Sequence, residues 1–251
     1  TYGDVTFENF NVDARENSYA QIAVEPDCGT LNITGNSSIL AREGMTGLYV
    51  AFWHTATYDG TTVNVNTTGK ITGKLVYEFD EDMTGDAAAT ENKAVLNITN
   101  GNFEITEIKT LFSGVTNEAL KKEKITVNGG TFSRDVSAYA ADNTPVASNN
   151  GTYYVGEETI QNAANNLSAG QQLKIEKGAV TINGAEYRAG GNATYTKPSS
   201  GGYYYYYPTT DTKADDTKGS PKTFDAGVGI YAVTAVLSVT GMAWTAKKRG
   251  N

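Results

Sequence analysis

Four segments of the chain alternate apolar and small polar residues and then stop at a residue that favours turns. They read Leu31-Asn-Ile-Thr-Gly, Val63-Asn-Val-Asn-Thr, Leu96-Asn-Ile-Thr-Asn and Ile125-Thr-Val-Asn-Gly, and their starts are 29 to 33 residues apart. Alternation with a period of two indicates β-strands that bury one face. The pattern predicts further strands between these segments, at residues 5–7, 21–24, 48–52 and 75–79.

The near-constant spacing predicts a solenoid, in which each coil buries its apolar face only by stacking on its neighbours. We therefore expect an all-β fold, a right-handed parallel β-helix, over residues 1–155. Its inward aliphatic positions would be Ile33, Val65, Ile98 and Val127, and its outward polar positions Asn32, Asn64, Asn97 and Thr126. A β-sandwich is the alternative, since it also consists of short strands and turns.

The pattern changes after residue 155. Residues 157–167 predict a short helix, and residues 173–175 and 180–182 predict a hairpin, so 156–189 would form a small α+β module. Residues 190–219 are rich in Gly, Ser, Thr, Pro and Lys and contain five consecutive tyrosines, Tyr203 to Tyr207. They have no apolar period, which predicts a disordered linker.

The end of the chain has the pattern of a membrane span. Residues 226–246 contain no charged residue, and Lys247, Lys248 and Arg249 follow directly. A helix of about 21 residues would cover roughly 30 Å, the thickness of a bilayer core. Under the positive-inside rule the basic cluster stays cytoplasmic, so the rest of the chain would face outward.

The residues before this span complete a known arrangement. Ser220, Pro221, Lys222, Thr223 and Phe224, followed by an apolar span and a basic tail, resemble the cell-wall sorting signals that sortases recognise. The Pro-x-Thr core matches the usual LPxTG motif, whereas Ser220 replaces its leucine and Phe224 its glycine. The resemblance implies a sortase as partner, cleavage after Thr223, covalent attachment to peptidoglycan, and display on a Gram-positive cell like those of gut Firmicutes. The precursor would span the membrane only transiently.

A second resemblance concerns the end of the predicted solenoid. The segment Asn128-Gly-Gly-Thr-Phe-Ser-Arg-Asp-Val-Ser-Ala-Tyr, with Gly151-Thr-Tyr-Tyr-Val after it, resembles the terminal coils of pectate-lyase-like β-helix proteins of gut bacteria. The resemblance covers residues 1–155 and implies the fold, but no reaction.

Composition excludes several classes of function. The net charge of −8 and the absence of a basic stripe argue against nucleic acid as a partner. Cys28 is the only cysteine, so the chain contains no internal disulfide, and His54 is the only histidine. A site that needs two imidazoles is therefore excluded, and we expect no cofactor other than a calcium ion.

The candidate calcium site is an acidic loop. Asp80, Asp82, Thr84, Asp86 and Glu91 occupy positions at which calcium loops place oxygen ligands, with a glycine after Thr84 for the sharp turn. However, an alanine stands at the eighth position, and a predicted strand precedes the loop. A solvated acidic loop is therefore the alternative.

Two functions of different kinds remain open. In the first, the chain is an adhesin that binds a glycan or a host surface, for which Trp53 and Tyr58 are the candidate sugar platform. Packing at a coil edge explains these aromatic residues equally well. In the second, it anchors a polysaccharide-degrading enzyme whose catalytic coils lie upstream. Glu78 and Glu104 are the isolated carboxylates considered for catalysis, which normally uses a pair.

Overall fold

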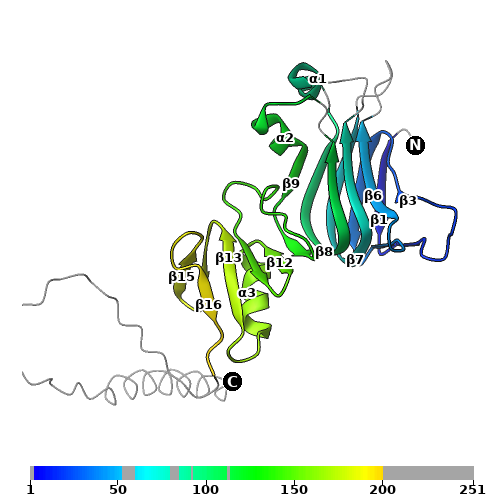
Figure 1. The fold of residues 1–251 in the computed structure, drawn as a ribbon. Helices are drawn as coiled ribbons and strands as arrows, with labels where there is room; N and C mark the ends of the chain where they lie inside the picture. Colours follow the sequence, from blue (N-terminus) through cyan, green and yellow to red (C-terminus); the bar gives the residue numbers. More distant parts are fainter. Residues whose placement is uncertain (1–2, 53–59, 80–84, 92, 112–113, 200–251) are drawn as a thin grey trace, which may run out of the picture. The chain divides into compact units, whose positions relative to one another are not determined.

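The computed structural model describes residues 3–52, 60–79, 85–91, 93–111 and 114–199. The chain divides into two units, Thr1–Tyr204 and Tyr205–Asn251, and all of the described residues belong to the first. This unit is mostly β and is built on one large mixed sheet, with a two-stranded sheet beside it (Figure 1).

The first part of the unit consists of strands that return to the same positions at regular intervals along the chain. Short strands open the series, and two long strands, β7 and β8, continue it (Figure 1). The strands are β1 (Asp4–Glu8), β2 (Asn11–Asp13), β3 (Ile22–Val24), β4 (Gly29–Gly35), β5 (Ser38–Leu40), β6 (Thr46–Phe52), β7 (Thr61–Phe79), β8 (Val95–Leu111), β9 (Ile125–Val127) and β10 (Gly130–Phe132).

These strands pair in three parallel series. The first series is β1-β4-β7-β8-β9, the second contains β2-β5-β7 and β8-β10, and the third is β3-β6-β7-β8. β7 therefore takes part in all three series along its length. All of the strands predicted from the alternation, at residues 5–7, 21–24, 48–52 and 75–79, lie within or overlap these elements, which confirms them.

The predicted aliphatic ladder is confirmed residue by residue. Ile33 pairs with Val65, Val65 with Ile98, and Ile98 with Val127. Each of the four side chains is at most 1% exposed. The period-two pattern thus identified both the buried face and the register, because a shift by one residue would turn every one of these side chains outward.

The outward row is also aligned as predicted. Asn32, Asn64, Asn97 and Thr126 are successive register partners. The Nδ2 atom of Asn64 donates to Oδ1 of Asn32 at 2.9 Å, and Nδ2 of Asn97 donates to Oδ1 of Asn64 at 3.0 Å. We call Asn32, Asn64 and Asn97 the asparagine ladder, since each carboxamide binds the next one along the stack.

One glycine explains how β7 passes from the second series to the third. Gly73 has φ +91°, a conformation that residues with a side chain rarely adopt. A Cβ atom at this position would lie 2.6 Å from the carbonyl oxygen of Met45. Glycine therefore permits the bend and also lets the backbone at Met45 approach.

The parallel pattern ends after β10. Phe132 stacks on its register partner Phe103, with ring centroids 4.7 Å apart and an angle of 11° between the rings. An isolated parallel bridge between Ala140 and Val127 is an exception to this beyond β10. The Tyr139 hydroxyl lies 3.3 Å from Oγ1 of Thr110, and both side chains are partly buried.

An antiparallel module follows. It comprises β11 (Val146–Asn149), β12 (Thr152–Val155), α3 (Glu157–Asn166), β13 (Gln172–Lys177), β14 (Ala179–Ile182), β15 (Ala185–Arg188) and β16 (Thr194–Thr196). The order β10-β12-β11-β13-β16 joins the module to the same large sheet. α3 confirms the predicted helix, and its Ile160 and Ala164 are fully buried in the module's own core.

The predicted hairpin of residues 173–175 and 180–182 is wrong. β13 pairs with β11 and β16, whereas β14 pairs with β15. Only Gly178 separates β13 from β14, which is too short for a two-residue hairpin turn. Asn183 and Gly184, with φ 51° and 82°, form the turn that pairs β14 with β15 instead, and Asn-Gly is the strongest hairpin dipeptide.

The predicted start of the linker at residue 190 is also wrong. β16 lies inside that range, and its Tyr195 is only 3% exposed. Lys197 then donates from Nζ to the carbonyl oxygens of Ala164 and Asn165 at 3.2 and 3.0 Å, at the end of α3. The folded module therefore includes residues that composition alone assigned to a disordered segment.

Candidate ligand-binding groove

A polar groove of about 440 Å³ lies between α3 and the large sheet. This volume is within the range of about 300–1,000 Å³ usual for ligand sites. Ten residues line the groove: Asn100, Thr131, Asn149, Tyr154, Thr159, Asn162, Ala163, Asn166, Leu167 and Gln171. Five of them carry a side-chain amide, three carry a hydroxyl and none carries a charge.

One wall of the groove is a face of α3. Thr159, Asn162 and Asn166 are three and four residues apart, so they project on the same side of the helix. The adjacent side holds Ile160 and Ala164, which are buried in the module's core. The amphipathic pattern of α3 thus fixes its orientation, and its amide side chains face the groove.

The floor comes from strands that are far apart in the sequence. Asn100 belongs to β8, Thr131 to β10 and Tyr154 to β12, and Thr131 is the register partner of Tyr154. β10 pairs with β8 on one side and with β12 on the other. The groove is therefore formed where the parallel strands meet the antiparallel module.

Several polar groups in the groove are available to a ligand. Among the described residues, the side-chain amides of Asn100, Asn162 and Asn166 make no hydrogen bond. Asn149 donates from Nδ2 to the carbonyl oxygen of Gln172 at 2.6 Å, so its own side-chain oxygen is left to accept from a ligand. Gln171 accepts from the Ser168 amide at 2.8 Å, which leaves its NH₂ group. Each amide can both donate and accept.

The groove stays uncharged at physiological pH. Burial raises the pKa of Tyr154 above its usual value near 10, although a hydrogen bond between its side chain and Thr152 opposes this shift. A raised pKa keeps the phenol protonated, so its hydroxyl remains a hydrogen-bond donor. The ring also contributes apolar surface beside the amides.

The acidic loop lies only partly within the described residues. Asp80, Asp82 and Thr84 fall outside them, as does the side chain of Glu91, while α1 (Gly85–Glu91) includes Asp86. Figure 1 shows α1 near α2 (Glu118–Lys124), at one end of the long strands. Across the described part of the chain, no three His, Cys, Asp or Glu residues form a group that could hold a metal ion. Calcium binding stays a prediction.

The Asp86 carboxylate already has partners. Its Oδ1 accepts from the amides of Thr116 and Asn117 at 2.8 and 3.0 Å, and its Oδ2 accepts from Oγ1 of Thr116 at 2.8 Å. These hydrogen bonds, led by the one from the Asn117 amide, lower the pKa of Asp86. Asp86 therefore joins α1 to the segment that begins α2.

The other predicted sites lie outside the described residues. These are Trp53 and Tyr58, the motif Ser220 to Phe224, and the basic residues Lys247, Lys248 and Arg249. The apolar residues 226–246 are also outside them. Within the ranges that the structure does describe, no helix has the length and apolar character needed to cross a membrane.

Each of the two isolated carboxylates already has a partner on a neighbouring strand. Glu104 forms an ion pair with Lys70, whose Nζ lies 2.7 Å from Oε1, and Glu78 accepts a hydrogen bond from the Tyr49 hydroxyl. They lie in different series of the sheet, Glu104 beside Thr72 and Glu78 beside Ala51. The structure does not bring them together as a catalytic pair.

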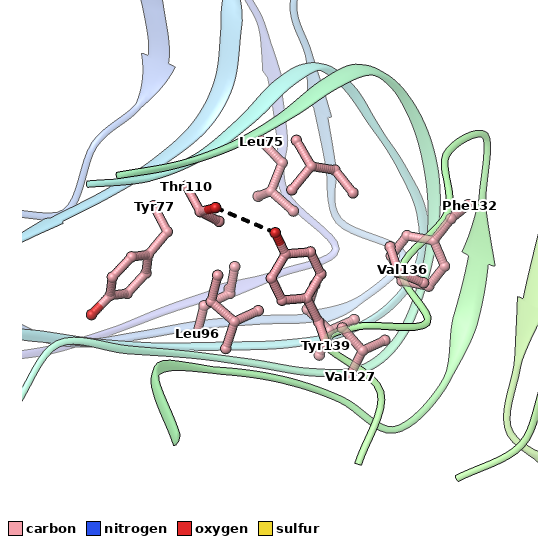
Figure 2. A pocket seen from close by; sticks show the side chains of 11 residues that line it. Leu75, Tyr77, Leu96, Thr110, Val127, Phe132, Val136 and Tyr139 are labelled. Atoms are coloured by element: carbon pink, nitrogen blue, oxygen red, sulfur yellow. Dashed lines mark hydrogen bonds between the residues drawn. The ribbon is translucent and has the colours of Figure 1, made fainter. Parts of the chain in front are cut away.

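An apolar cavity lined by residues of β7, β8 and β9 is a packing feature. Figure 2 shows Leu75, Leu96, Val136 and Tyr139 pointing into it. Its volume of about 10 Å³ is at the lower limit for a single water molecule. It is therefore not a ligand site, and the polar groove remains the better candidate.

Comparisons with protein-family models, with curated proteins and with solved structures gave no match to this chain. Sequence reasoning missed the groove, although Thr159, Asn162 and Asn166 lie on one face of the correctly predicted helix. The floor residues have no such spacing, because tertiary pairing alone brings them together.

Proposed function

We propose that this chain is a wall-anchored bacterial surface protein that acts as an adhesin. Its right-handed parallel β-helix would form a rigid stalk, and the groove beside α3 would hold the ligand. The three parallel series and the continuous aliphatic ladder support a β-helix, because stacked coils bury one core in this way. The motif around Thr223, the apolar span and the basic tail support sortase anchoring.

The observation that carries a binding function is the uncharged, amide-rich groove. A glycosidase would need a pair of carboxylates beside its substrate, and no lining residue of the groove has one. Unbonded amides can hold a ligand without any chemical step. The second candidate, a stalk for an enzyme placed upstream, remains compatible with the same anchoring signal.

Anchoring is tested by expressing the full chain in a Gram-positive host that contains a sortase. Muramidase-released protein should yield a peptide that ends at Thr223 and carries a wall fragment. Thr223→Ala should stay in the membrane fraction with its tail through Asn251. Thr217→Ala, a matched change upstream of the motif, should behave as the wild type. Recovery of the wild type only from membranes, with its tail intact, would contradict the proposal.

A further inference from the structure

We infer that the groove beside α3 binds an uncharged oligosaccharide. This inference deepens the proposed function, on which it rests, by naming the class of ligand. The hydroxyl groups of a sugar each donate and accept a hydrogen bond. Asn100, Asn162 and Asn166 offer both kinds of partner from the wall and the floor of the groove, and none is bound within the described chain.

The absence of charge among the ten lining residues selects against ionic ligands. An anionic or cationic ligand would lose hydration on entering the groove without gaining an ion pair. A neutral sugar loses only hydrogen bonds to water, and the amides replace these. Because burial raises the pKa of Tyr154, this preference should not change across the physiological range.

A peptide fits the groove less well than a sugar. An extended peptide usually binds by adding a strand to a free sheet edge. Here β10 is paired with both β8 and β12, and β12 is paired with both β10 and β11. These two floor strands therefore have no free edge, and recognition depends on side-chain amides and hydroxyls.

The decisive variant is Asn162→Asp, with Asn165→Asp as its matched control. Both residues are exposed asparagines on α3, but only Asn162 lines the groove. The substitution keeps the shape of the side chain, replaces the NH₂ donor group by an acceptor oxygen and adds a negative charge. The same change at Asn165 reports any effect on the helix itself. Asn166→Asp is a second groove variant near the end of the helix.

The probes are fluorescently labelled oligomers of glucose, galactose, mannose and xylose, titrated into the purified full chain and followed by anisotropy. Oligogalacturonate and oligoglucosamine are the anionic and cationic comparators. We expect at least one neutral oligomer to bind. Asn162→Asp and Asn166→Asp should weaken its affinity about tenfold or more, equal to about 1.4 kcal/mol, and Asn165→Asp should leave it within about twofold.

The inference is overturned if no neutral oligomer binds, if the charged oligomers bind better, or if Asn162→Asp and Asn165→Asp have equal effects. These results are independent of wall attachment. Protein found in the wall that binds no neutral oligomer would contradict this inference alone. Protein that binds an oligomer but never reaches the wall would contradict the anchoring.

Discussion

Replacement of Asn64 by alanine tests whether the asparagine ladder stabilises the stacked parallel strands. Asn64 is the central member, since it donates to Asn32 at 2.9 Å and accepts from Asn97 at 3.0 Å. Asn64→Ala removes both hydrogen bonds at once. The aliphatic ladder beneath, including the neighbouring Val65, should keep its packing because the changed side chain points outward.

The expected loss follows from the two hydrogen bonds. A neutral intramolecular hydrogen bond contributes about 0.5–1.5 kcal/mol net, so the pair should contribute about 1–3 kcal/mol. All three asparagines are half-buried, so water can partly replace the lost partners. We therefore expect a loss of about 1–2 kcal/mol in the free energy of unfolding.

Equilibrium denaturation measures this loss, with Asn66→Ala as the control. Asn66 lies two residues further along β7, is exposed, and makes no side-chain hydrogen bond within the described residues. Its substitution should change the free energy of unfolding by no more than about 0.5 kcal/mol. In a double-mutant cycle, Asn32→Ala and Asn64→Ala should couple by about 0.5–1.5 kcal/mol. Equal losses for Asn64→Ala and Asn66→Ala, or an absence of coupling between Asn32→Ala and Asn64→Ala, would show that the asparagine ladder does not stabilise the fold.

Two further changes test other parts of the fold. Ile98→Asp places a charge at a site that is 0% exposed, so it should lower the free energy of unfolding by several kcal/mol. Asn66→Asp, at an exposed position, should lower it only slightly. Thermal or chemical denaturation measures both losses. Asp86→Asn should destabilise the chain above about pH 5, and the difference from wild type should disappear in acid. Hydrogen bonds hold the pKa of the Asp86 carboxyl lower in the folded state than in the unfolded state. The stabilisation that results is present above the unfolded-state pKa and is lost as the pH falls through the folded-state pKa. Denaturation midpoints across the pH range measure it, and a constant difference would contradict this role of Asp86.

The strands and their register could be predicted because period-two alternation repeats at a near-constant interval. Ile33, Val65, Ile98 and Val127 each follow an outward polar residue, and that pattern fixes which residues pair once one face is buried. The same reasoning located α3, whose apolar positions are spaced for a helix. Local pattern was sufficient wherever the buried face belonged to a single element.

The pairing of β13 and β14 could not be read in this way, since each strand has a suitable alternation and the partner depends on the turn. Gly178 alone lies between them, while Asn183 and Gly184 follow β14. The correct β14–β15 hairpin follows if the Asn183-Gly184 dipeptide is given more weight than the short distance in sequence between β13 and β14. Tyr195 was missed for a different reason, because a three-residue strand among Gly, Asn and Thr has too little pattern to distinguish it from a linker.

The groove illustrates why polar sites are harder to predict than cores. Burial imposes one requirement on every residue of an apolar face, and therefore leaves a period in the sequence. A binding groove needs only that polar side chains from several elements meet, so Asn100, Thr131 and Asn162 share no spacing. The sequence does contain the pattern of one wall of the groove, because α3 has a polar face beside its apolar face. Apart from Glu157 and Glu158 in its first turn, the polar residues of α3 are amides and one threonine, whereas Glu, Lys and Arg prevail on a purely solvated helix surface. This amide-rich face is the feature of the amino-acid pattern that indicates a binding role for this side of α3.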